Sequence, residues 1–302
     1  MKKFPLLFLV FALAAGFAAA EEAEGIGLTA GVEFGVVEVN TDDRGYYLDV
    51  FVEYENSFLD EALDVSASLL YDLSFSDPDN EHSLTLDFSI GFNLGLGASS
   101  TLSFILANEN DFTLFPKEGH PVLGIIRPGI GFNQGLGDSG GDLYAQVDAP
   151  IRYLNYGDEP VYYGLDFTLG WASSFGLGLE AGAYLLLSPS HKIILNNKAV
   201  NGLTGISFTV SYENGPFYAD IAATAPIKKA SYNKGYLYVD EGSAPYSYFD
   251  TSAGSGGVSI TPSFAYTFDF GLGIYVYCTF DGIGIKDNGI SISPAIGVTY
   301  SF

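Results

Sequence analysis

Long stretches of the chain alternate strictly between large apolar residues and small or polar ones. Between residues 84 and 97, every even position is Leu, Phe or Ile, and every odd position is Thr, Asp, Ser, Gly or Asn. Successive side chains of a β-strand point to opposite faces, so a period of two predicts a strand with one apolar and one polar face. Residues 46–55 and 161–171 show the same alternation, with acidic residues on the polar face.

The alternation predicts about fourteen strands, and a count of about 12 to 16 fits the pattern. The expected ranges are 26–39, 46–55, 63–75, 83–97, 100–107, 122–134, 142–154, 161–173, 175–188, 203–213, 216–227, 258–270, 272–281 and 290–302. Most are longer than the ~5–6 residues of a globular strand and match the ~9–11 residues of a tilted strand that crosses a bilayer. No segment after residue 20 is apolar for 18 residues, which argues against a transmembrane helix there.

A sheet inside a bilayer has no water to satisfy its edges, so strands of this kind must close into a barrel. We therefore expect an all-β fold, a closed antiparallel transmembrane β-barrel with an up-and-down meander. In an even-stranded barrel the links from even to odd strands are short periplasmic turns, and the other links are external loops. The expected long connections, 108–121, 189–202 and 228–257, all follow odd-numbered strands.

The composition combines two properties that conflict in an ordinary soluble protein. The chain is 48% hydrophobic and 15% aromatic, yet it carries 36 acidic and 12 basic residues, a net charge of −24. The first property excludes intrinsic disorder, and the second argues against a nucleic acid as partner. A barrel resolves the conflict by turning its apolar face to lipid. The alternative is a soluble β-sandwich or a large soluble barrel, which rarely needs so many long strands.

Residues 1–20 have the three parts of a secretory signal peptide. Lys2 and Lys3 precede an apolar run that ends in Ala18-Ala19-Ala20. The alternative, a membrane anchor helix, would need ~20 apolar residues, and this run is shorter. We expect cleavage after Ala20, which leaves residues 21–302 as a single barrel domain with a long external loop at 228–257.

The final segment alternates up to the last residue of the sequence. Ile296, Val298, Tyr300 and Phe302 occupy every second position. This pattern resembles the closing strand of bacterial outer-membrane β-barrel proteins. The resemblance implies the outer membrane of a diderm bacterium as location, contact with its lipid, and recognition of this strand by the barrel assembly machinery.

Within that class, the strand number and length look like those of monomeric 14-stranded porins. The long-chain fatty-acid transporters, which are also 14-stranded, usually carry an N-terminal hatch before the first strand. Here about five residues separate Ala20 from the first expected strand, which disfavours that group.

Aromatic residues are expected in two belts, because a ring with one wet end suits the headgroup zone. The periplasmic belt would contain Tyr54, Trp171, Phe175, Tyr212, Phe217, Phe268, Phe270, Tyr300 and Phe302. The outer belt would contain Tyr46, Tyr71, Tyr153 and Tyr163.

The polar faces predict an acidic pore lining. Its acidic members would be Glu33, Asp49, Glu53, Glu55, Asp64, Asp72, Asp87, Asp148, Asp166, Glu180, Glu213, Asp220, Asp269 and Asp281. Its basic members would be Arg127 and Arg152. Fourteen strands come closer to the sixteen that leave an aqueous channel than to the eight that side chains fill, and inward glycines would leave further room. A pore lined by one sign of charge attracts the opposite ions, so we expect a preference for cations.

Two features leave alternatives open. Arg127 and Arg152 would either set up a local transverse field with Asp148 and Asp166 or form paired ions that pack the lumen. The loop at 228–257 would either fold in as a constriction, cover the pore as a lid, or stay a solvated surface loop with a small hairpin.

The leading functional hypothesis is therefore a porin that gives passive, cation-preferring diffusion of small hydrophilic solutes. The alternative is a non-conducting structural or adhesin-type barrel whose external loops bind partners. We expect no enzyme, because His82, His120 and His191 fall in expected external loops without a nucleophile motif. No cofactor or metal is expected either, since the single Cys278 and these histidines form no ligand spacing.

Overall fold

A computed structural model describes most of the chain. The described residues are 27–37, 39, 45–59, 61–75, 81–114, 123–137, 140–154, 162–187, 194–195, 198–199, 202–226, 258–284 and 290–302. The expected signal peptide, the loop at 228–257, His120 and His191 lie outside them. Within these ranges no helix has the length and apolar character that a membrane crossing requires.

Strands make up nearly all of the described structure. The first nine are β1 (Gly27–Val37), β2 (Gly45–Phe58), β3 (Leu63–Ser74), β4 (Glu81–Gly95), β5 (Ser100–Leu114), β6 (Leu123–Gly135), β7 (Asp142–Asp148), β8 (Ile151–Leu154) and β9 (Tyr162–Ala172). They are followed by β10 (Leu177–Leu187), β11 (Ile194–Leu195), β12 (Lys198–Ala199), β13 (Gly202–Asn214), β14 (Phe217–Pro226), β15 (Val258–Thr267), β16 (Leu272–Ile283) and β17 (Ser291–Ser301).

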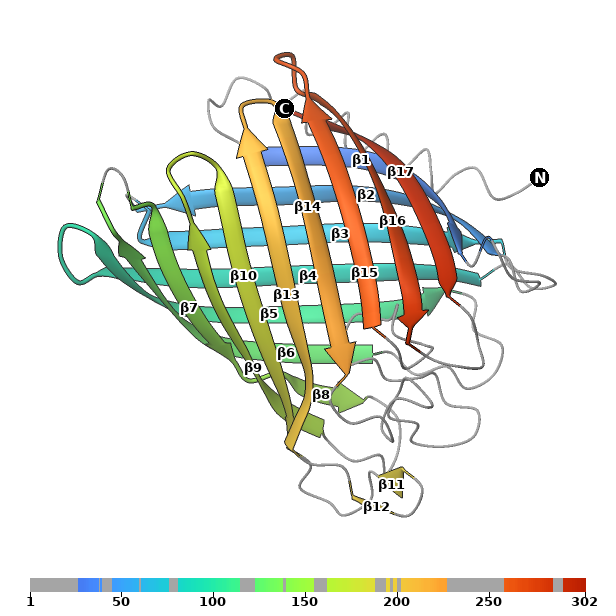
Figure 1. Cartoon of the computed structure of the whole chain (residues 1–302), viewed down its shortest axis with the longest axis horizontal. Coiled ribbons are helices and arrows are strands. Elements are labelled where there is room, and N and C mark those ends of the chain that lie inside the picture. Colours follow the sequence, from blue (N-terminus) through green and yellow to red (C-terminus); the bar gives the residue numbers. More distant parts are fainter. Residues whose placement is uncertain are drawn as a thin grey trace.

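The main sheet closes on itself through antiparallel pairs. From β1 to β7 and from β13 to β17 each strand pairs with the next along the chain. β10 pairs with both β9 and β13, and β17 pairs with β1 over seven registered positions. β7 and β8 both lie between β6 and β9 and form one interrupted strand, so the wall has fourteen strands. Figure 1 shows this wall wrapped around one axis, with β1 beside β17. The predicted all-β closed barrel and its strand count are confirmed.

The interruption between β7 and β8 falls at Ala149 and Pro150. Proline has no backbone N–H to give to a ladder, so it suits a break in a strand. The flanking bonds continue around it: the N–H of Ala149 donates to the carbonyl of Pro128 at 2.8 Å, and the N–H of Gly164 donates to the carbonyl of Pro150 at 3.0 Å. The sequence predicted one continuous strand over 142–154, and this detail is wrong.

Two expected loops also contain strand residues that the alternation did not predict. β5 continues to Leu114 and pairs with β4 up to His82, so the long connection expected at 108–121 begins later. The connection expected at 189–202 contains the two-stranded sheet of β11 and β12. β5 was underestimated because Asn108 and Asn110 interrupt the apolar side of its alternation.

Short connections gather at one end of the strands, as expected. The links between β4 and β5, β9 and β10, β13 and β14, and β15 and β16 each span four residues or fewer. The turn between β15 and β16 closes with Gly271, whose N–H donates to the carbonyl of Phe268 at 2.9 Å. Its φ of 88° lies in the left-handed region that favours glycine.

The burial pattern is inverted relative to a soluble protein. Phe88 and Ile90 keep 43% and 45% of their surface exposed, whereas Glu33 and Asp281 are 9% and 7% exposed. A soluble fold exposes charge and buries large apolar side chains. The inversion places the apolar surface on the outside of the barrel, where lipid can cover it.

Aromatic residues of the expected periplasmic belt contact one another at the end with the short turns. Ring centroids of Trp171 and Phe175 lie 6.4 Å apart, and those of Tyr300 and Phe302 lie 4.8 Å apart. The Trp171 indole Nε1 donates to the carbonyl of Gly140 at 2.8 Å, which ties this ring to the neighbouring turn. The clustering is consistent with a belt, and its position at a membrane surface stays a prediction.

The outward orientation of the apolar face can be tested with adjacent residues of β4. Ile90→Arg should lower the free energy of unfolding in lipid by about 2–4 kcal/mol, because it places a charge against hydrocarbon. Ser89→Arg, on the opposite face, should cost under about 1 kcal/mol because it meets water and acidic side chains. Urea unfolding in lipid vesicles, followed by the fluorescence of Trp171, measures both. Equal losses would contradict the assignment of the faces.

Candidate functional site

The polar side of the strands faces the inside of the barrel. The hydroxyl oxygens of Tyr47 on β2 and Tyr277 on β16 lie 2.9 Å apart, although β1 and β17 lie between these strands. Likewise Tyr144 on β7 donates to Glu180 on β10 across β9. Adjacent strands are about 4.8 Å apart, so side chains of non-adjacent strands meet only on the concave face of a curved sheet. We call this side the inner face.

The described acidic residues of the predicted lining lie on these strands, with one exception. They are Glu33 on β1, Asp49, Glu53 and Glu55 on β2, Asp64 and Asp72 on β3, Asp87 on β4, Asp148 on β7, Asp166 on β9, Glu180 on β10, Glu213 on β13, Asp220 on β14 and Asp281 on β16. Arg127 lies on β6, and Arg152 lies on β8 with its side chain outside the described part of the structure. That these residues line an open pore stays a prediction.

The prediction for Asp269 is wrong. β15 ends at Thr267, and Asp269 is an exposed residue of the turn before β16. Phe268 and Phe270 continue the apolar alternation into the turn, which extended the expected strand too far. Their rings lie 5.4 Å apart, and the Phe268 ring also lies 4.9 Å from that of Tyr266 at the end of β15.

A carboxylate on β1 binds three tyrosines where the first and last strands meet. Tyr47 and Tyr277 donate to Glu33 Oε1 at 2.8 and 2.6 Å, and Tyr275 donates to Glu33 Oε2 at 2.7 Å. We call Glu33, Tyr47, Tyr275 and Tyr277 the seam cluster. Hydrogen bonds to an ionised acceptor are stronger than neutral ones, so these donors offset the burial of Glu33.

Glycines make room for the tyrosine rings of the seam cluster. Gly297 on β17 lies in register between Tyr275 and Glu33, and a Cβ there would sit 2.0 Å from Cζ of Tyr275. A Cβ at Gly35 would sit 2.1 Å from Cζ of Tyr47. Without a side chain at Gly297, the Tyr275 ring can cross β17 and reach Glu33 on the far side.

The same packing occurs elsewhere on the inner face. The ring of Phe51 covers Gly31, and the ring of Tyr144 covers Gly170, each within 2.2 Å of the position a Cβ would take. We expected inward glycines to leave the lumen more open. At these positions that expectation is wrong, because a ring from the neighbouring strand fills the space.

Acidic residues stand side by side next to the seam cluster. Glu33 pairs in register with Asp49, and Asp49 pairs in register with Asp72, so three carboxyl groups occupy one row across β1, β2 and β3. Directly opposed like charges repel one another. This row therefore brings three acidic groups close together on one part of the inner wall.

Arg127 forms an ion pair across the interrupted strand. Its Nη1 lies 2.8 Å from Oδ2 of Asp166 on β9, and the Asp166 side chain is buried. Asp148 lies in register with Asp166 and accepts from Gln146 Nε2 at 2.8 Å. Of the two alternatives for the arginines, pairing is thus observed for Arg127.

A second group of tyrosines holds acidic residues on the opposite part of the wall. Tyr144 donates to Glu180, and Tyr218 donates to Asp220 Oδ2 at 2.9 Å. Ser263 on β15 also donates to Asp220, at 2.7 Å. Tyr218 lies near enough to Glu180 for the two groups to interact electrostatically.

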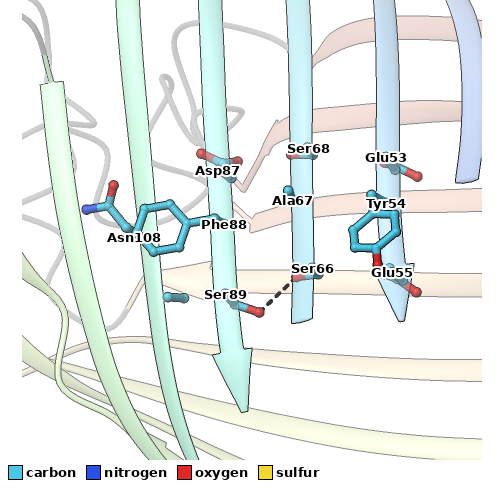
Figure 2. Close-up of a pocket in the computed structure, with 11 residues that line it drawn as sticks. Glu53, Tyr54, Glu55, Ser66, Ala67, Ser68, Asp87, Phe88, Ser89 and Asn108 are labelled. Carbon is cyan, nitrogen blue, oxygen red and sulfur yellow. Dashed lines mark hydrogen bonds between the residues drawn. The ribbon is translucent and has the colours of Figure 1, made fainter. Parts of the chain in front are cut away.

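A cavity of about 290 Å³ opens between β2 and β5. Three carboxyl groups and three hydroxyl groups contribute to its lining: Glu53, Glu55, Asp87, Ser66, Ser68 and Ser89. Figure 2 shows them on neighbouring strands, with the hydroxyls of Ser66 and Ser89 joined by a hydrogen bond of 2.8 Å. The described lining contains no basic side chain, so the cavity is acidic.

Other chemistries find little support in the described residues. No group of three or more His, Cys, Asp or Glu side chains in them is arranged to hold a metal ion. His82 was expected in an external loop but belongs to β4, where it pairs in register with Leu73. That the chain is not an enzyme stays a prediction.

Sequence reasoning missed the tyrosines of the inner face. Tyr47, Tyr275 and Tyr277 occupy the polar side of the alternation, where the predicted pore lining included only charged residues and glycines. The available signal was a tyrosine at a position that should be small or polar. Which carboxylate each ring would reach depends on the register of the closed barrel.

Comparison with known proteins gives similarity of structure only. No family model matches the sequence, and no curated protein sequence is similar to it. Among solved structures, a deltaS2S3 mutant of the TodX monoaromatic hydrocarbon channel is 11% identical, with 94% of this chain and 92% of that chain covered and a TM-score of 0.48. The outer membrane phospholipase A of Escherichia coli is 10% identical, with 90% and 89% covered and a TM-score of 0.43.

A third structure, the KdgM porin, is 8% identical, with 91% of this chain and 99% of that chain covered and a TM-score of 0.38. These proteins are all outer-membrane β-barrels, and the chain is similar to that class. At such low identities and TM-scores no activity is carried over, and the fold rests on the strand pairing of the chain itself.

Two inner-face glycines test the packing of the seam cluster. Gly297→Ala should destabilise the barrel by about 1–3 kcal/mol, because the new methyl overlaps the Tyr275 ring. Gly95→Ala is the matched control, since nothing lies within 4 Å of a Cβ at Gly95. The control should be neutral or stabilising by up to about 1 kcal/mol. Urea unfolding in lipid measures the stability of both variants. Equal changes in stability would show that the Tyr275 ring moves aside for the new methyl group without a measurable loss.

Proposed function

We propose that the protein is an outer-membrane channel for passive diffusion of small hydrophilic solutes, with a preference for cations. The observation that carries this proposal is the charge on the inner face. Arg127 is the only basic side chain that the structure describes, and it is paired with Asp166. The acidic cavity and the carboxyl row of Glu33, Asp49 and Asp72 lie on the same face.

Such a lining selects by electrostatics. A water-filled lumen with walls of low dielectric constant focuses the field of its fixed charges, so small cations concentrate inside and anions are excluded. Tyrosine donors lower the cost of holding carboxylates at the wall and leave their net charge unchanged. Fourteen strands favour a lumen wide enough for small hydrated solutes.

The proposal includes the location of the protein. We infer export through cleavage of the signal peptide after Ala20 and insertion in the outer membrane of a diderm bacterium. The closing strand would be read by the barrel assembly machinery, and its outward side chains would then meet lipid. This is supported by the exposure of those side chains, which are Ile296, Val298, Tyr300 and Phe302.

Planar-bilayer recording of the refolded protein tests the function. In a KCl gradient, we expect step-like conductance and a reversal potential of the sign that indicates potassium preference. A reversal potential of the opposite sign would refute the cation preference. Absence of conductance from heat-modifiable, folded protein would favour the alternative, a structural or adhesin-type barrel whose external loops bind partners.

Neutralising the acidic cavity should weaken the selectivity. The triple variant Glu53→Gln, Glu55→Gln, Asp87→Asn removes three inner charges, so the potassium-to-chloride permeability ratio should fall by about twofold or more. Asp269→Asn is the control, because Asp269 lies in an exposed turn outside the barrel wall. Its permeability ratio should match the wild type. An unchanged ratio in the triple variant would show that these residues do not face the ion path.

A further inference from the structure

Passive diffusion does not require the arrangement of rings in the seam cluster. The ring planes of Tyr275 and Tyr277 are parallel within 2°, and their centroids lie 6.5 Å apart. Side chains two residues apart on a strand are separated by about 6.8 Å. Because the Tyr275 ring covers Gly297, the two rings lie side by side along the wall and form a flat aromatic platform. Both residues are partly exposed, so the platform is accessible from the lumen.

Hydrogen bonding makes this platform electron-rich. Tyr47, Tyr275 and Tyr277 all direct their hydroxyl protons at Glu33. A phenol that donates to a carboxylate gains electron density on its oxygen and ring. The negative face of an aromatic ring attracts cations, and this attraction increases with the electron density of the ring.

Carboxyl groups lie beside the platform. Glu33 is buried beneath the hydroxyls, and Asp49 and Asp72 continue its row along the wall. The surface therefore combines ring faces with the hydrogen-bonded carboxylate of Glu33.

This combination fits an organic cation better than other ligands. Anions are repelled by the carboxylate of Glu33. A bare metal ion would need several free carboxylate oxygens, but both oxygens of Glu33 already accept hydroxyl protons. An alkylammonium ion can lay its methyl or methylene groups on the rings while its charge faces the carboxylates.

We propose that the seam cluster is a binding subsite for small organic ammonium ions that pass through the barrel. The proposal rests on the proposed channel function and specifies one class of solute. Tyr275 and Tyr277 form the platform, Tyr47 flanks it, and Glu33 supplies the negative charge. Binding would be weak and reversible, as transit requires.

The test uses choline as the probe in planar bilayers with KCl on both sides. Choline should reduce the potassium current saturably in the wild type. Tyr275→Leu/Tyr277→Leu should raise the half-blocking concentration by about fivefold, because it removes the ring faces. The matched control is Tyr144→Leu/Tyr218→Leu, which removes two tyrosines that hold Glu180 and Asp220; its half-blocking concentration should stay within about twofold of wild type.

A second variant and a neutral solute separate failure of the subsite from failure of the channel. Should the double leucine variant fail to fold, Glu33→Gln keeps the size of the side chain, removes the charge, and should also weaken the block. A potassium-selective channel whose choline block is unchanged by either variant overturns the subsite and leaves the channel intact. Equal block by glucose overturns the assignment to cations. Absence of conductance, or anion preference, overturns the channel function and the subsite with it.

Discussion

Every edge of a sheet inside a lipid bilayer must find a partner, because hydrocarbon offers no hydrogen bonds to exposed backbone groups. In this chain the pairing of β1 with β17 meets that requirement, over a register that runs from Thr29 and Ser301 to Gly35 and Ala295. Once the edges are joined, the sheet has an inside and an outside. The sorting of apolar and acidic side chains, and the meeting of residues from distant strands, both depend on this closure.

The inner wall is organised by rings that lie over glycines. A tyrosine needs more room than a curved wall of neighbouring side chains provides, and a glycine on the next strand supplies it. The Tyr275 ring passes over Gly297 and reaches Glu33 on the next strand. The Tyr144 ring passes over Gly170 and reaches Glu180 on the next strand. Acidic residues of the lumen are therefore held in fixed positions by phenols, which keeps their charge while limiting their motion.

The fold could be predicted from the sequence because a period of two reports directly which residues share a face. The strand ends were harder to predict. Phe268 and Phe270 continue the alternation into a turn, so Asp269 was wrongly assigned to a strand. Asn108 interrupts the apolar side of the alternation, so β5 was predicted to end too early. The site could be predicted only as a set of charges. The partners of Glu33 and the pairing of Arg127 with Asp166 depend on how far the barrel is sheared, which local patterns do not encode.

The seam cluster also joins a strand that is synthesised early to one that is synthesised late. Glu33 belongs to the first strand, whereas Tyr275 and Tyr277 follow it by 242 and 244 residues. Until the final strands arrive, this carboxylate lacks two of its three donors, and burying it is costly. Only a barrel in which β16 has reached its place gives Glu33 all three hydroxyl donors. Incomplete chains would retain an exposed, hydrated acid at their open edge.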